Sequence, residues 1–161
     1  MITNLEKYRA VLADRGIKPT AQRLTILSAV ASDRSHVTIR GLHAALVKRI
    51  PTLSKTTLYS TLELFAAEGL VRALTIDPAE VRYDGVGSPH HHFFCTACGR
   101  ILDIDLTCAR ERAGEIQGHR IDEVHGYFKG ICRDCLSPKK SHTARPYRNT
   151  QRLSRRRIPH A

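Results

Sequence analysis

Two Cys-x-x-Cys pairs constrain the fold of this chain more than any other feature. Cys95-Thr-Ala-Cys98 and Cys132-Arg-Asp-Cys135 are separated by thirty-three residues. A two-residue spacer lets both thiolates of a pair approach one ion, and two pairs complete the tetrahedron of sulfur ligands that suits zinc. Because this site has no open coordination position, we expect a structural role. It would join the strand before Cys95 to a strand ending near Cys132, in a module too small to bury a large core.

Disulfides and an exposed redox dithiol are the other interpretations of the cysteines. A redox dithiol needs one pair and not two, and disulfides are rare in the cytoplasm. We expect a cytoplasmic protein, because Glu6 and Asp14 lie where a secretory peptide would be basic and then apolar. No apolar run approaches the ~20 residues of a membrane span, so we expect no membrane partner. Cys108 has no partner at the paired spacing and is interpreted as a small buried residue.

Charge divides the chain into three parts. Residues 1–82 hold 12 Lys and Arg against 7 Asp and Glu, a net charge of +5, and residues 83–136 hold 6 against 8, a net of −2. Residues 137–161 hold 8 against none and lack apolar periodicity, so we expect a disordered basic tail. The segregation of charge from cysteines predicts a phosphate-facing domain at 1–82 and a metal-binding domain at 83–136.

Three segments of the first domain have apolar residues at helical spacing, residues 17–32, 37–50 and 53–70. Thr20 and Ser54 are expected N-caps, whereas Pro51 and Gly69 are expected to end helices. Residues 70–86 then resemble two strands around an Asp-Pro turn. This order is typical of a winged helix-turn-helix, whose second helix enters the major groove of DNA.

The segment at residues 53–70 would be this second helix of the motif, and it would contact DNA through its polar face near its N-terminus. The alternative is an all-α domain whose polar helix faces are merely solvated, and the basic charge favours DNA binding. The predicted contacts are Lys55, Thr56, Thr57 and Tyr59 on this helix, with Arg15, Lys18 and Arg23 near phosphates.

The histidines of "HHHFFC", residues 90–95, predict a second metal site. If this segment is a strand, His90 and His92 share one face, whereas His91 and Cys95 share the other. Two imidazoles with nearby carboxylates, for which Asp84 and Asp103 are candidates, suit Fe(II), Mn(II) or Zn(II). The alternative is a polar surface strand or a chance histidine tract.

With these motifs the chain resembles the ferric uptake regulator superfamily over about residues 3–136. The segments that carry the resemblance are "GIKPTAQRLTIL", "HVTIRGLHAAL", "LSKTTLYSTLELFAAEGLV", "RYDGV", "HHHFFCTACGRILDI" and "CRDC". The resemblance implies an α+β fold, with an N-terminal winged helix-turn-helix DNA-binding domain followed by a small α/β dimerisation domain that has a four-cysteine zinc site. It also implies a homodimer that binds a palindromic operator in double-stranded DNA, and no enzymatic activity or organic substrate.

The family's structural zinc corresponds to Cys95, Cys98, Cys132 and Cys135, which agrees with the spacing. Its regulatory metal, Fe(II) or Mn(II), corresponds to His36, Asp84, His90, His92 and Asp103. His36 is implied by the resemblance alone, and it belongs to the DNA-binding domain. A metal that joins His36 to the second domain would clamp a hinge around residues 77–85 and set the spacing of the recognition helices.

The spacing of Asp84 six residues before His90, and an aspartate rather than a glutamate at Asp103, resemble the peroxide-responsive branch of the family. That branch implies oxidation of His36 or His90 by hydrogen peroxide, with loss of metal and release of DNA. Three alternatives remain: a metal-uptake regulator without peroxide sensing, a constitutive zinc-stabilised nucleic-acid-binding protein, and a metal-dependent hydrolase. The hydrolase is disfavoured because the sequence offers no evident general base or substrate motif.

Overall fold

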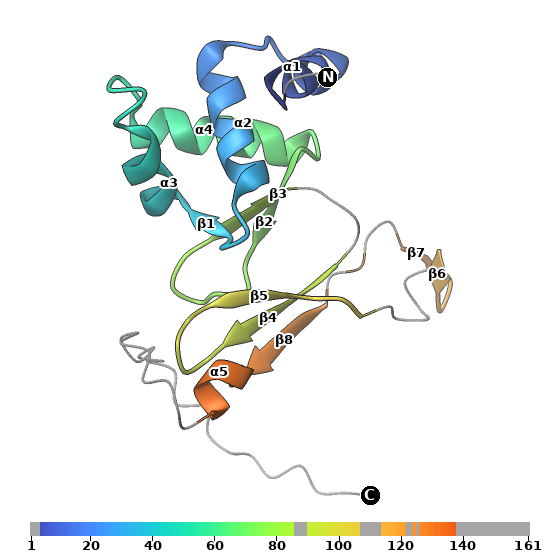
Figure 1. The fold of residues 1–161 in the computed structure, drawn as a ribbon. Helices are drawn as coiled ribbons and strands as arrows, with labels where there is room; N and C mark the ends of the chain where they lie inside the picture. Colours follow the sequence, from blue (N-terminus) through green and yellow to red (C-terminus); the bar gives the residue numbers. More distant parts are fainter. Residues whose placement is uncertain (1–3, 86–89, 107–113, 122–123, 125, 138–161) are drawn as a thin grey trace, which may run out of the picture.

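The computed structural model describes residues 4–85, 90–106, 114–121, 124 and 126–137. Within these residues a helical domain with a small sheet lies above a second sheet, and a short helix lies at the far end (Figure 1). The α+β fold class is therefore confirmed. The expectations for Cys108 and for the basic tail fall on residues outside the described ones. None of the described helices is long and apolar enough to cross a membrane.

The first domain packs its helices around one apolar core. In chain order its elements are α1 (Asn4–Asp14), α2 (Ala21–Ser32), β1 (Val37–Thr38), α3 (Ile39–Leu46), α4 (Lys55–Ala67), β2 (Val71–Leu74) and β3 (Arg82–Gly85). The core includes the predicted apolar stripes of α2 and α4, together with Leu12 of α1 and Leu42 and Leu46 of α3. Helix α1 was not predicted. Its residue Leu12 is fully buried, so α1 is part of the core.

The predicted helix caps are confirmed at both main helices. Thr20 accepts a hydrogen bond from the backbone N–H of Arg23, and Ser54 accepts one from that of Thr57. Helix α4 ends before Gly69, whose φ of 66° is the left-handed conformation that glycine adopts without strain.

The prediction that the middle helix continues to Pro51 is wrong. Helix α3 ends at Leu46, because the backbone N–H groups of Arg49 and Ile50 both bond to the Leu46 carbonyl in a turn. This turn brings Leu53 into the core, and its carbonyl lies 2.9 Å from Nε2 of His43.

The first sheet has the strand order β1-β3-β2, all antiparallel. The two predicted strands are β2 and β3, whereas β1 is too short for a periodic signal. Strand β3 continues to Gly85, three residues beyond the boundary proposed at residue 82. The pairing of Arg72 with Asp84 places this candidate ligand in the first sheet.

The second domain is a small sheet with the order β5-β4-β8, followed by α5. Its elements are β4 (His91–Cys95), β5 (Ile101–Ile104), β6 (Glu115–Ile116), β7 (His119–Arg120), β8 (Tyr127–Gly130) and α5 (Arg133–Leu136). Strand β4 pairs with β5 antiparallel and with β8 parallel, and Cys95 lies opposite Gly130. The two cysteine pairs therefore lie at the ends of neighbouring strands, as predicted.

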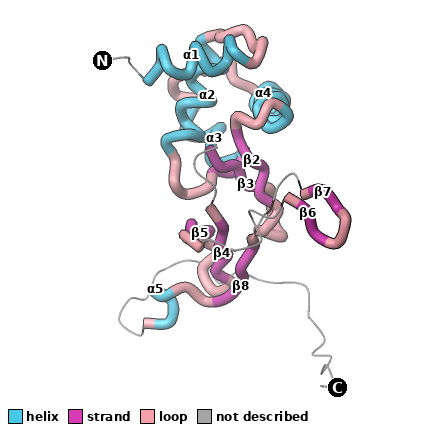
Figure 2. The backbone as a smooth tube through the Cα atoms, turned by 90° about the vertical axis from the view of Figure 1, so that its right-hand side faces the viewer, coloured by secondary structure: helices cyan, strands magenta, loops and turns pink. Residues whose placement is uncertain are grey.

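An apolar cluster joins the two domains. Leu74, the last residue of β2, and Ile76, just beyond it, pack with Phe94 and Ile101 of the second sheet, and each is at most 4% exposed. Figure 2 shows β2 and β3 of the first sheet above β4, β5 and β8 of the second.

The predicted hinge at residues 77–85 is wrong. Residues 77–81 connect β2 to β3, and the Asp77 carboxylate accepts a hydrogen bond of 2.8 Å from Arg82, so this segment is the tip of the wing. Residues 82–85 are β3 itself.

Candidate metal centres

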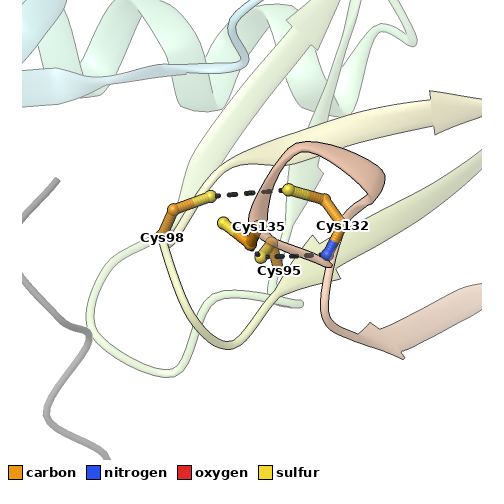
Figure 3. Close-up of side chains that lie close together, drawn as sticks. All are labelled: Cys95, Cys98, Cys132 and Cys135. Atoms are coloured by element: carbon orange, nitrogen blue, oxygen red, sulfur yellow. Dashed lines mark hydrogen bonds between the residues drawn. The ribbon is translucent and has the colours of Figure 1, made fainter. Parts of the chain in front are cut away.

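Four cysteine sulfurs converge where β4 and β8 end, as Figure 3 shows. Cys95 and Cys132 are buried, whereas Cys98 and Cys135 are half-buried, and all four are free thiols. The Cys95–Cys135 and Cys98–Cys132 sulfur pairs are each 3.9 Å apart, and all four sulfurs lie within 4.8 Å of one another. A tetrahedral ion with Zn–S bonds of about 2.3 Å separates its sulfurs by about 3.8 Å. The cluster therefore fits one zinc-sized ion.

The local backbone favours thiolates at three of the four positions. Burial raises the pKa of Cys95, but backbone N–H groups, with that of Cys132 first, outweigh burial and lower the pKa overall. Burial also raises the pKa of Cys98 and of Cys132, but a hydrogen bond from the Arg100 side chain at Cys98, and one from the backbone N–H of Cys135 at Cys132, contribute most to lowering each pKa overall. A hydrogen bond with Cys132 raises the pKa of Cys135 to about 12. Without an ion the cluster keeps a proton, which metal binding would release.

The second centre combines residues from both domains. Nε2 of His36, in the first domain, lies 2.9 Å from Oδ1 of Asp103, in the second. Nε2 of His90 lies 3.1 Å from Nε2 of His92 and 3.1 Å from Oδ2 of Asp84. His36, His90, His92 and Asp103 form a group in which every donor atom lies within 4.8 Å of the others, and Asp84 adjoins it. The structure thus brings together all five residues proposed as regulatory ligands.

Sheet register explains this meeting. The pairing of Val37 with Tyr83, continued by one residue, places His36 beside Asp84, and His92 lies opposite Asp103 in the second sheet. The centre is therefore formed by two cross-strand pairs, one from each domain, and by His90 just before β4.

His36 occupies a special backbone conformation. It follows a turn in which the Asp33 carboxylate accepts a hydrogen bond of 2.6 Å from the backbone N–H of Ser35. Its φ is 57°, a left-handed conformation that is uncommon in residues other than glycine and is concentrated at functional sites. This conformation leads the chain from α2 into β1 and leaves the His36 side chain 1% exposed.

The donor atoms are arranged as ligands rather than as hydrogen-bond partners. Both ring nitrogens of His36 and Oδ2 of Asp84 are buried without a correctly aligned hydrogen-bond partner among the described residues, despite their short distances to neighbours. Seven pairs of donor atoms are 2.9 to 4.0 Å apart. Ligands with bonds of about 2.1 Å to one ion are separated by about 3.0 Å at right angles and about 4.2 Å when opposite. The residues therefore fit a single divalent ion with nitrogen and oxygen ligands.

The charges in this centre suit metal binding. Burial lowers the pKa of His36, against the opposing effect of Asp103 and Asp84, so its imidazole is neutral as a ligand must be. Burial raises the pKa of Asp84, but the three neighbouring histidines, His92 first, lower it overall. The Asp103 side chain is 46% exposed, and that of His90 is 19% exposed, so the centre is accessible on one side.

The predicted DNA-contacting residues lie on two parts of the first domain. Lys55, Thr56 and Tyr59 are exposed at the start of α4, as an interface requires. The hydroxyl of Thr57 is 2.8 Å from that of Ser54, so it takes part in the helix cap.

The three predicted phosphate contacts also have bonds within the chain. The Arg15 guanidinium donates a hydrogen bond to the carbonyl of Glu68 at the end of α4. Arg23 donates one of 3.1 Å to the carbonyl of Lys18. Each arginine retains further donors, and Lys18 is exposed.

Sequence reasoning missed Arg100, which contacts two of the cysteines. The sequence signal for this contact was the position of Arg100, a basic residue directly after the Cys-x-x-Cys-Gly segment. It also missed Ile76, whose burial depends on the second domain.

The fold and the two clusters together define a winged-helix protein with two candidate metal centres. The sequence model of the Ferric uptake regulator family matches residues 14–127, and the chain belongs to this family.

Two curated relatives are similar over most of the chain. The peroxide operon regulator of Bacillus subtilis (strain 168) is 31% identical over 141 residues, which cover 86% of this chain and 97% of that protein. The peroxide-responsive repressor PerR of Staphylococcus epidermidis is 29% identical over 134 residues, covering 81% of this chain and 89% of that one. A structure of the Helicobacter pylori ferric uptake regulator, with a TM-score of 0.68 and 18% identity, covers 85% of this chain and 94% of that chain, and it shows the same fold.

Proposed function

We propose that the protein is a metal-dependent transcriptional repressor that binds a palindromic DNA operator as a homodimer. The observation that carries this proposal is the position of His36, which meets His90, His92 and Asp103 across the domain boundary. A ligand set drawn from both domains lets metal occupancy set the orientation of α4. Since the half-sites of an operator are spaced by about 34–36 Å per turn of DNA, a change in that orientation changes affinity. The coupling energy is the difference in metal-binding free energy between the domain arrangement that binds the operator and the arrangement that does not.

In this proposal the four cysteines hold a structural zinc ion, and His36, Asp84, His90, His92 and Asp103 hold Fe(II) or Mn(II). The sulfur spacing supports the first assignment, because it matches the edge of a zinc–thiolate tetrahedron. The mixed nitrogen and oxygen donors support the second. The names of the relatives, all transcriptional regulators, support a non-enzymatic role.

We further propose that the protein senses hydrogen peroxide. The names of the two curated relatives support this proposal, as do the accessible side of the centre and the aspartates at positions 84 and 103. Bound Fe(II) would supply the redox chemistry by which one peroxide oxygen enters a C–H bond of a ligand imidazole and the other leaves as water. His36 or His90 would be the oxidised residue. An oxidised imidazole would be a weaker metal ligand, so the protein would lose the metal and release the DNA.

The test compares iron with manganese. The protein is loaded with Fe(II) or Mn(II), exposed to micromolar peroxide and assayed for operator binding by fluorescence anisotropy. We expect binding to be lost only in the iron form, with a mass gain of one oxygen on a peptide that contains His36 or His90. Retention of binding in both forms would instead support a metal-uptake regulator without peroxide sensing.

A ligand variant tests metal dependence itself. We expect His90→Ala to abolish metal-dependent operator binding while zinc content and dimerisation are retained. His119→Ala is the matched control, because His119 is exposed on β7. Unchanged operator binding by His90→Ala would refute the switch and support a constitutive zinc-stabilised DNA-binding protein.

A further inference from the structure

The guanidinium of Arg100 lies between the two cysteine pairs. Its Nε donates a hydrogen bond of 3.4 Å to the sulfur of Cys98, and its Nη2 donates one of 3.5 Å to the sulfur of Cys132. One flat cation therefore contacts one sulfur of each pair. Its Nη2 also donates a hydrogen bond of 2.7 Å to the carboxylate of Asp134.

Neighbouring contacts hold Arg100 in this position. Its carbonyl accepts a hydrogen bond of 2.9 Å from the backbone N–H of Cys95, so its main chain is tied to the first cysteine pair. Asp134 lies on α5 next to Cys135, so the carboxylate that orients the guanidinium comes from the second pair. The planar fork of an arginine can bond three acceptors at fixed angles, which the single ammonium of a lysine cannot reproduce.

We propose that Arg100 is a positioning residue of the four-cysteine centre, which holds Cys98 and Cys132 as metal ligands and makes their sulfurs less reactive. This inference rests on the proposed zinc ion. Four thiolates and one zinc ion have a net charge of −2, and a cation bonded to two of the sulfurs offsets part of that charge. Outer-shell donors orient ligands and withdraw electron density from them, and their loss lowers metal affinity about 10- to 100-fold.

The cysteines provide an internal comparison. Cys98 and Cys135 are both half-buried, one in each pair. The structure gives Arg100 a bond to Cys98, and among the described residues it gives none from Arg100 to Cys135. If Arg100 lowers the reactivity of the sulfur that it contacts, Cys98 is less reactive than its exposure predicts, and Cys135 is the reference.

The first experiment measures zinc loss from the full-length protein. Zinc release to an excess of chelator is followed for wild type, Arg100→Met and Arg133→Met. Arg133 is the matched control, because it is exposed on α5 and carries the same charge. We expect Arg100→Met to bind zinc about 10- to 100-fold more weakly than Arg133→Met. Arg100→Lys, which keeps the charge without the fork, should be intermediate, and it provides the comparison if Arg100→Met does not fold.

The second experiment measures sulfur reactivity. The zinc-loaded protein is treated briefly with N-ethylmaleimide, and modification of each cysteine is quantified by mass spectrometry. We expect Cys135 to react before Cys98 in wild type, and Cys98 to gain reactivity selectively in Arg100→Met. A uniform increase at both sites would indicate general loosening and would overturn the proposal.

Equal zinc binding by Arg100→Met and Arg133→Met would also overturn it, as would wild-type zinc binding by Arg100→Lys. Purified wild-type protein without zinc would instead refute the proposed zinc ion. These failures are therefore distinguishable.

Discussion

The apolar contact between the domains predicts that Ile76→Val raises the metal concentration needed for operator binding. Ile76 is 1% exposed and packs in a cluster to which both domains contribute, and which includes Phe94, two residues after His92 on β4. The contact stabilises the observed arrangement of the domains without any metal. Metal and apolar contact then favour the same arrangement, so weakening one increases the need for the other.

The magnitude follows from the single methylene that the substitution removes. Ile→Val at a buried position typically lowers stability by about 0.5–1.5 kcal/mol. Because each 1.4 kcal/mol is about a factor of ten in an equilibrium constant, the midpoint of a Mn(II) titration should rise about 2- to 12-fold. This 2- to 12-fold range applies when most metal-free molecules do not have the observed arrangement of the two domains.

The assay is operator binding by fluorescence anisotropy during Mn(II) titration, with Ile26→Val as the control. Ile26 is 0% exposed and lies in the core of the first domain, so its substitution should lower the free energy of unfolding by a similar amount without moving the midpoint. Equal midpoints for the two variants would refute the idea that the interdomain cluster contributes to the switch.

Three further predictions concern protons and salt. Burial lowers the pKa of His36, so below about pH 6.5 the unfolded chain binds more protons than the folded protein does. The free energy of unfolding of the metal-free protein should therefore decrease as the pH is lowered through this range. The decrease should be at most about 1.4 kcal/mol per pH unit. In urea denaturation at several pH values, His36→Gln should show a smaller decrease in the free energy of unfolding than wild type. The same pH dependence in both proteins would exclude His36 as its cause. Lys55→Ala should weaken operator binding and reduce the slope of log affinity against log salt by about 1, and an unchanged slope would place Lys55 away from phosphates. Deletion of residues 138–161, which hold eight Lys and Arg, should flatten that slope further; a slope equal to that of the full chain would show that the tail makes no phosphate contacts.

Features that depend on short-range rules could be predicted from the sequence. The caps at Thr20 and Ser54 were predictable because a hydroxyl bonds to a backbone N–H three residues away. The cysteine pairs were predictable because a two-residue spacer brings two sulfurs together whatever the rest of the fold. The separation of His90 and His92 from His91 follows from strand alternation, and the contact of His91 with Gly126 on the other face agrees with it.

Where the short-range signal was weak, prediction failed. Strand β1 has two residues, too few for a pattern, and α1 was not assigned although Leu5, Tyr8 and Leu12 are at helical spacing. The Asp-Pro turn between β2 and β3 was predicted from the sequence, but the hinge placed at residues 77–85 came from the resemblance and not from a local pattern.

The sequence by itself determined how the cysteines divide into pairs and that His90 and His92 share one face of a strand, because spacing along the chain sets those geometries. Only the tertiary structure decided that His36 reaches Asp103, that Ile76 packs on Phe94 and that Arg100 connects two sulfurs. The first and third contacts join residues more than thirty positions apart, and Ile76 and Phe94, which are closer in the chain, belong to different domains. The first two depend on how the two domains pack against each other, and the third depends on the strand order of the second sheet; no local pattern of residues contains either property.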